Sequence, residues 1–155
     1  MTNRQRAAII LGMHDAIVSL TGLIAGLYFA SVETNIIVIS CVISSISASL
    51  SMGAANYLAT RTTSRRGALG AATLTFFAYM ITCILLIMPF FMVANRTTEL
   101  MAVISMAVLI ILGFNLVFYH NKHFWNHFME MLGICTLVSI AAFLIGESAS
   151  KLFGI

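Results

Sequence analysis

Five long apolar runs, separated by short polar connectors, dominate the chain. They are about Ala7–Ala30, Ile36–Ala59, Ala68–Ala94, Leu100–Tyr119 and Phe128–Lys151. Because about 20 mostly apolar helical residues cross the hydrocarbon core of a bilayer, each run predicts one transmembrane helix. We therefore expect an all-α, polytopic membrane protein with a single transmembrane domain over residues 1–155.

The composition requires lipid as the solvent. Hydrophobic residues make up 61% of the chain and charged residues 8%, whereas soluble globular domains have roughly 45–50% and about 25%. A nucleic-acid partner needs clustered Lys and Arg with stacking aromatic residues on a polar surface, and the sequence has no such cluster. The common catalytic motifs are also absent from the sequence. We expect a lipid bilayer as the environment, no nucleic-acid partner, no enzymatic activity and no permanently bound cofactor.

The positive charges near the ends of the runs predict the orientation, because cytoplasmic loops carry an excess of Lys and Arg. With a cytoplasmic N-terminus, two positive residues fall outside, Arg96 and Lys151, and six fall inside. The six are Arg4, Arg6, Arg61, Arg65, Arg66 and Lys122. We expect the N-terminus in the cytoplasm and the C-terminus on the far side. Pro89 is expected to kink or end the third helix.

Asp15 is the most informative residue, because it lies inside the first apolar run. An ionisable side chain within a span costs at least about 2.5 kcal/mol, so it usually faces the bundle interior and serves a pathway. Gly12, Asp15, Ser19, Gly22 and Gly26 recur at helical spacing and share one face. Small residues on that face allow another helix to approach closely. The pattern predicts a tightly packed polar seam; a carboxylate that only holds helices together is the alternative.

The second run carries a matching set of candidate metal ligands. Ser51, Met52 and Asn56 lie on or beside one helix face, and Met52 is at nearly the depth of Asp15. Carboxylate, thioether, amide and hydroxyl groups, including the hydroxyl of Ser19, suit Fe(II) or Mn(II) better than Mg(II). Gap-filling core packing is the alternative role of Met52.

The four histidines form two sets. His14 adjoins Asp15 but points about 100° away around the helix, so the spacing alone does not put both side chains in one site. His120, His123 and His127 share one helical face by their spacing. That face could bind a metal ion, and it equally suits an amphipathic turn at the membrane interface.

The other polar residues predict local roles. Glu33 and Glu99 are expected to be solvated loop residues, and Glu147 is expected to pair with Lys151 four residues later. The cysteines lie inside apolar runs without CxxC spacing, which predicts buried free thiols rather than a disulfide framework. They are Cys41, Cys83 and Cys135.

Two segments of the chain carry motifs of a known family. Residues 12–26, GMHDAIVSLTGLIAG, resemble the first-helix motif of the vacuolar iron transporter family, written Asp-Gly-x-x-Ser with two later glycines. Residues 49–58, SLSMGAANYL, resemble its second-helix motif, Ser-Met-x-x-x-Glu-Tyr, and residues 144–146 resemble the end of its fifth helix. The resemblance implies a five-helix dimer that exports Fe(II), and often Mn(II), from the cytosol in exchange for protons. It also implies that Asp15 and Met52 line the pathway.

The chain departs from the family pattern at three places. Ala16 replaces a Gly, Asn56 replaces a Glu, and the Thr60–Gly67 connector is too short for the Glu-rich metal-binding segment that many members carry. We expect a divalent metal exporter, working as a homodimer in a prokaryotic plasma membrane, or in a vacuolar or other endomembrane in a eukaryote. The alternative is a non-transporting scaffold or subunit in which Asp15 is structural.

Overall fold

The computed structural model describes residues 2–63, 66–93, 95–118 and 124–153. Its elements are α1 (Asn3–Phe29), α2 (Thr34–Thr63), α3 (Ala68–Ile87), α4 (Pro89–Met92), α5 (Arg96–Phe118) and α6 (Phe124–Phe153). Within these ranges, five helical stretches are long and apolar enough to cross a membrane, and α3 and α4 together form the third. The prediction of an all-α protein with five membrane-spanning helices is confirmed.

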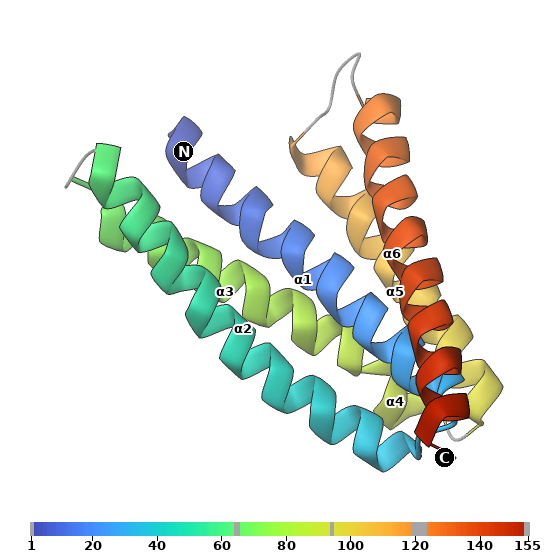
Figure 1. The fold of residues 1–155 in the computed structure, drawn as a ribbon. Helices are drawn as coiled ribbons and strands as arrows, with labels where there is room; N and C mark the ends of the chain where they lie inside the picture. The colour runs from blue at the N-terminus through green and yellow to red at the C-terminus, as the bar shows by residue number, and fades with distance from the viewer. Residues whose placement is uncertain (1, 64–65, 94, 119–123, 154–155) are drawn as a thin grey trace.

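The first helix, α1, is central in the bundle. It packs mainly against α3 and α6, and it also touches α2 and α5. Figure 1 shows α2 and α3 on one side of α1, and α5 and α6 on the other. The two chain termini lie at opposite ends of the bundle (Figure 1). We call the end that holds the start of α1 the N-terminal end; α2 and α5 finish there, and α3 and α6 begin there.

Local chemistry explains several helix boundaries. Thr2 and Gln5 form a capping box at the start of α1: Thr2 Oγ1 accepts from the Gln5 N–H at 3.3 Å, and Gln5 Oε1 accepts from the Thr2 N–H at 2.8 Å. Gly67 has a positive φ of 85°, so a residue without a Cβ makes the tight turn into α3. Pro89 occupies the first position of α4, and α3 ends at Ile87. The predicted interruption of the third span at Pro89 is therefore confirmed.

Large apolar side chains cover the outer faces of the helices. Leu69, Val117 and Leu137, on three different helices, are 70%, 73% and 70% exposed. A soluble protein of this size does not leave so many such side chains in water, whereas lipid tails solvate them. All three cysteines, in contrast, are buried and free, as predicted.

The described charges gather at the two ends of the bundle. Arg4, Arg6, Arg61 and Arg66 lie near the N-terminal end, and Arg96 and Lys151 belong to the opposite end. This distribution is the one that a cytoplasmic N-terminus requires. The orientation itself stays a prediction.

Two of the acidic groups of the opposite end, Glu147 and Glu99, behave differently from each other. Glu147 pairs with Lys151 at 2.7 Å, as predicted. The expectation of a solvated Glu99 is wrong: this residue lies in the first turn of α5, is 6% exposed and accepts a hydrogen bond from Thr34 Oγ1 at 3.0 Å. The first residue of α2 therefore supplies the partner that makes burial of this carboxylate tolerable.

Glycines on α1 allow two helices to touch its backbone. A Cβ added at Gly12 would collide with the carbonyl group of Thr75 on α3. Gly26 packs against α6 in the same way, because a Cβ added at Gly146 would collide with the Gly26 carbonyl oxygen. A Cβ at Gly22 would meet the Val138 side chain of α6. The predicted close approach of other helices to this stripe is therefore found, with α3 at one part of α1 and α6 at another.

We predict that Gly146→Ala destabilises the fold, whereas the same change at Gly133 does not. The new methyl at position 146 would press on backbone, and overpacking of this kind costs about 1–3 kcal/mol. Gly133 has open space around its Cβ position, so alanine there should gain helix propensity of about 1 kcal/mol. A thiol-reactive dye that reports exposure of the buried cysteines during heating measures both variants. Equal melting temperatures would contradict the proposed backbone contact.

Candidate metal site

Asp15 lies on α1 beside a cavity of about 260 Å³ between α1 and α6. The cavity is lined by Leu11, His14, Asp15, Val18, Met131 and Ile134. The Asp15 side chain is partly buried, and it forms no hydrogen bond or ion pair with any residue that the structure describes. A carboxylate in a membrane span is therefore left without a neutralising partner among these residues, and it faces space that an ion could enter.

On the α3 side of α1, a part-buried pair of hydroxyl groups lies one helical turn from Asp15. Tyr79 is 2% exposed, and its hydroxyl oxygen lies 2.7 Å from Ser19 Oγ. Asp15 is within electrostatic range of both Tyr79 and Cys83. Ser19 lies one turn after Asp15 on α1, and its hydroxyl is already paired to Tyr79 of α3; its role as a metal ligand stays a prediction.

The candidate ligands of α2 are in two environments. Met52 is partly buried and packs against the apolar core, and Ser51 is exposed. The neighbouring Gly53 packs against Ala72 and Phe76 of α3. Neither Met52 nor Ser51 is among the described residues that line the cavity at Asp15. The structure brings α2 close to α3 without bringing these two side chains into that cavity.

Asn56 links α2 to α3. Its Nδ2 donates to Thr75 Oγ1, and its Oδ1 accepts from Thr60 Oγ1 at 3.2 Å. Thr75 is fully buried, and its hydroxyl lies 3.0 Å from the carbonyl oxygens of both Ala8 and Ala71. One threonine therefore joins α1, α2 and α3, with Asn56 as the part contributed by α2.

The structure resolves the relation between His14 and Asp15, which helical spacing left open. Both residues line the same cavity, and the ring of His14 meets Phe114 of α5 edge-on at 5.8 Å between centroids. His127 lies on α6, with Nδ1 3.6 Å from Glu130 Oε2. His120 and His123 lie outside the described residues, so the predicted histidine face is seen only in part.

Two residues near Asp15 were missed by the sequence analysis. Met131 of α6 lines the cavity, and Asn115 of α5 is fully buried with its Nδ2 3.8 Å from Met131 Sδ. A polar Asn inside the fourth apolar run was a usable signal. No comparable signal distinguished Met131 in the sequence, because the chain has ten Met residues and most such side chains fill core gaps.

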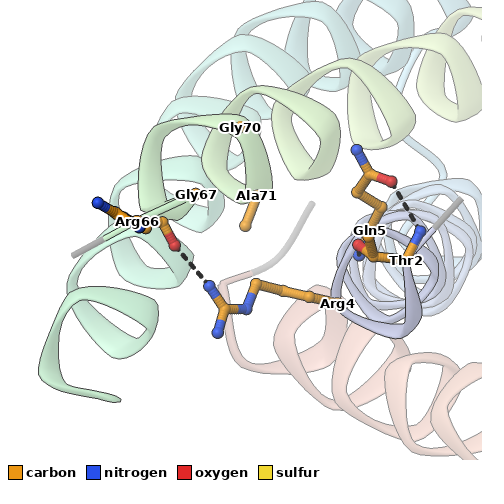
Figure 2. Close-up of a pocket in the computed structure, with 7 residues that line it drawn as sticks. All are labelled: Thr2, Arg4, Gln5, Arg66, Gly67, Gly70 and Ala71. Atoms are coloured by element: carbon orange, nitrogen blue, oxygen red, sulfur yellow. Dashed lines mark hydrogen bonds between the residues drawn. The ribbon is translucent and has the colours of Figure 1, made fainter. Parts of the chain in front are cut away.

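A second pocket, of about 550 Å³, lies at the N-terminal end of the bundle. Figure 2 shows its lining residues, Thr2, Arg4, Gln5, Arg66, Gly67, Gly70 and Ala71. Arg4 reaches across it and donates from Nη1 to the Arg66 carbonyl oxygen at 2.6 Å, which ties α1 to the turn before α3. The guanidinium groups of Arg4 and Arg66 repel cations from this second pocket. The candidate metal site is therefore the cavity at Asp15.

The cavity at Asp15 is not a preformed cage of strong ligands. Among the described residues, no group of three or more His, Cys, Asp or Glu side chains is arranged to hold a metal ion. Structural metal sites are usually closed by four such ligands. The arrangement at Asp15, with one carboxylate and mostly neutral neighbours, suits passing occupancy better than permanent binding.

The fold and the site define a polytopic helical membrane protein whose first span holds a carboxylate with no ion-pair partner in the part of the chain that the structure describes. The sequence profile of the VIT family matches residues 6–66, which hold most of α1, all of α2 and the start of the next turn. This match supports membership of the vacuolar iron transporter family, the family that the two motifs resemble. No curated protein matches the chain. The family match contains Asp15, Met52 and Asn56 and ends before α3.

We predict that Thr75→Val lowers stability more than Thr73→Val on the same helix. Loss of the Thr75 hydroxyl leaves the Asn56 amide with only the long contact to the Ala71 carbonyl oxygen at 3.5 Å, and a buried polar group that loses its partner costs about 1–3 kcal/mol. Thr73 is exposed and bonds only within its own helix, to the Gly70 carbonyl oxygen. Thiol-dye melting curves of the two variants provide the measurement. Equal melting curves for Thr75→Val and Thr73→Val would contradict a stabilising hydrogen bond between Asn56 of α2 and Thr75 of α3.

Proposed function

We propose that the protein moves a divalent metal ion, Fe²⁺ or Mn²⁺, out of the cytosol in exchange for protons. VIT family membership and a membrane-spanning helical fold indicate a metal-ion transporter in general. The choice of iron or manganese, the exchange for protons and the direction of export are parts of the proposal. Iron and manganese homeostasis would be its physiological role.

One observation carries the proposal: Asp15 is a carboxylate within a membrane span, beside a cavity, with no ion-pair partner among the described residues. A carboxylate that only stabilised the bundle would be expected to have such a partner, because an unpaired charge in low dielectric is costly. A passing cation or a proton can supply the missing positive charge. Alternation between the two is the simplest form of metal–proton exchange.

The other ligands in the proposal are neutral. Met52 would provide a thioether for a softer metal, and Ser19, Ser51 and Asn56 would provide oxygens, at other points of the path than the cavity at Asp15, which none of the four lines. Asn56 is a special case, because its amide already joins α2 to α3. Its Oδ1 accepts one hydrogen bond, from Thr60, and the second lone pair of this oxygen is the one that could bind a metal ion.

The proposed setting follows from the family and from the charges. A homodimer in a prokaryotic plasma membrane, with the N-terminus in the cytoplasm, fits the family pattern; a vacuolar or other endomembrane applies to a eukaryote. The arginines of the N-terminal end support the orientation by the positive-inside rule. With that orientation, the cavity at Asp15 opens in the cytoplasmic half of the bundle, where exported metal would enter.

We predict that Asp15→Asn lowers metal flux into proteoliposomes by about tenfold or more, since even the loss of a supporting metal-site residue costs roughly 10–100-fold. Flux of Fe²⁺ and Mn²⁺ is followed with a metal-quenched dye, and proton movement with a pH dye in the same vesicles. Glu33→Gln is the matched control, because Glu33 is an exposed carboxylate at the opposite end of the bundle.

The alternative function is a membrane scaffold in which Asp15 only holds helices. Asparagine keeps a hydrogen-bonding side chain of the same shape, so a scaffold predicts wild-type behaviour for Asp15→Asn. Equal flux through wild-type protein, Asp15→Asn and empty vesicles would overturn the transport proposal in favour of the scaffold.

A further inference from the structure

Two buried polar atoms, on different helices, have no hydrogen-bond partner. Among the described residues these are His14 Nε2 on α1 and Asn115 Oδ1 on α5. Each unsatisfied atom costs about 1–3 kcal/mol. Orphaned groups of this kind usually indicate a water molecule or an ion that completes them.

Met131 connects the two unsatisfied residues. Its Sδ lies 3.8 Å from Asn115 Nδ2, and its side chain lines the same cavity as His14 and Asp15. The ring of His14 packs edge-on against Phe114, the residue that precedes Asn115 in α5. Two helices therefore bring His14 and Met131 to the cavity of one carboxylate, and α5 places the amide group of Asn115 next to the thioether.

Core packing explains only part of this arrangement. The edge-on contact with Phe114 accounts for the carbon side of the His14 ring. It does not account for a buried Nε2 without a partner, or for the amide oxygen of Asn115, whose Nδ2 is already used by the Ile111 carbonyl oxygen at 2.8 Å. An ion bound between them would use both atoms at once.

We propose that the cavity between α1 and α6 binds a first-row divalent metal ion through His14 Nε2, Met131 Sδ and Asp15. Asn115 Oδ1 is the fourth ligand. The proposal rests on the proposed transport function for the role of Asp15, and it adds ligands from α5 and α6 that lie outside the segment matched by the family. Of the two ions proposed above, the imidazole and the thioether favour Fe²⁺ over Mn²⁺; they also suit Co²⁺ and Zn²⁺, whereas all-oxygen sites suit Mg²⁺ and Mn²⁺.

The test is a titration of the purified full-length protein with Co²⁺ alone, followed by the visible absorption of the bound ion. His14→Gln and Met131→Leu should each weaken Co²⁺ binding by about tenfold or more. The matched control is Met129→Leu, a methionine on the exposed face of the same helix. It should stay within about twofold of wild type, as surface substitutions usually do.

Folding of each variant is checked by the melting of the buried thiols. Met131→Leu nearly conserves the volume of the side chain, so it is expected to fold. If His14→Gln does not fold, the Co²⁺ affinity of Met131→Leu tests the site. A wild-type Co²⁺ affinity in Met131→Leu, and in His14→Gln where it folds, overturns the site and leaves a buried water as the occupant.

The failure of this site and the failure of the transport proposal give different results. Loss of flux in Asp15→Asn together with unchanged Co²⁺ affinity in the His14 and Met131 variants overturns the site and keeps transport. Weakened Co²⁺ binding in those variants together with wild-type flux in Asp15→Asn supports the site and overturns the role of Asp15 in transport.

Discussion

The structure depends on the close contact of α1 with two other helices through its glycines. In a bilayer, lipid tails solvate apolar side chains as well as another helix does, so helices associate through close packing and polar contacts. Gly12 lets the backbone of α3 approach, and Gly26 lets α6 approach where Gly146 faces it. Asp15 lies between these two points along α1, so its surroundings are set on both sides by backbone contacts that a Cβ would disrupt.

The spans and the small-residue stripe could be predicted from the sequence because each depends on residues within one helix. Burial of Glu99 could not be predicted, since its partner Thr34 belongs to another helix, 65 residues earlier. The same holds for the group around Met131: Asn115 and His14 reach it from α5 and α1. Helical periodicity gives the face on which a side chain lies, but it does not say which helix covers that face.

The departure at Asn56 has a structural reason as well as a chemical one. The amide donates to Thr75 and accepts from Thr60, and only a side chain with both functions can do so. A Glu at this position, when ionised, could only accept, and it would place a second charge within the bundle toward its N-terminal end. In this chain the position links α2 to α3, which leaves Asp15 as the charged group of the site.

A single carboxylate among neutral ligands has a consequence for transport. A site must bind an ion well enough to take it from water, yet weakly enough to release it. Asp15 offsets only half the charge of a divalent ion, so the complex keeps a positive charge that the low dielectric disfavours. Neutral nitrogen, sulfur and oxygen ligands at His14, Met131 and Asn115 offset part of the lost hydration without adding charge. The balance favours brief occupancy, and a proton on Asp15 then restores neutrality after the metal leaves.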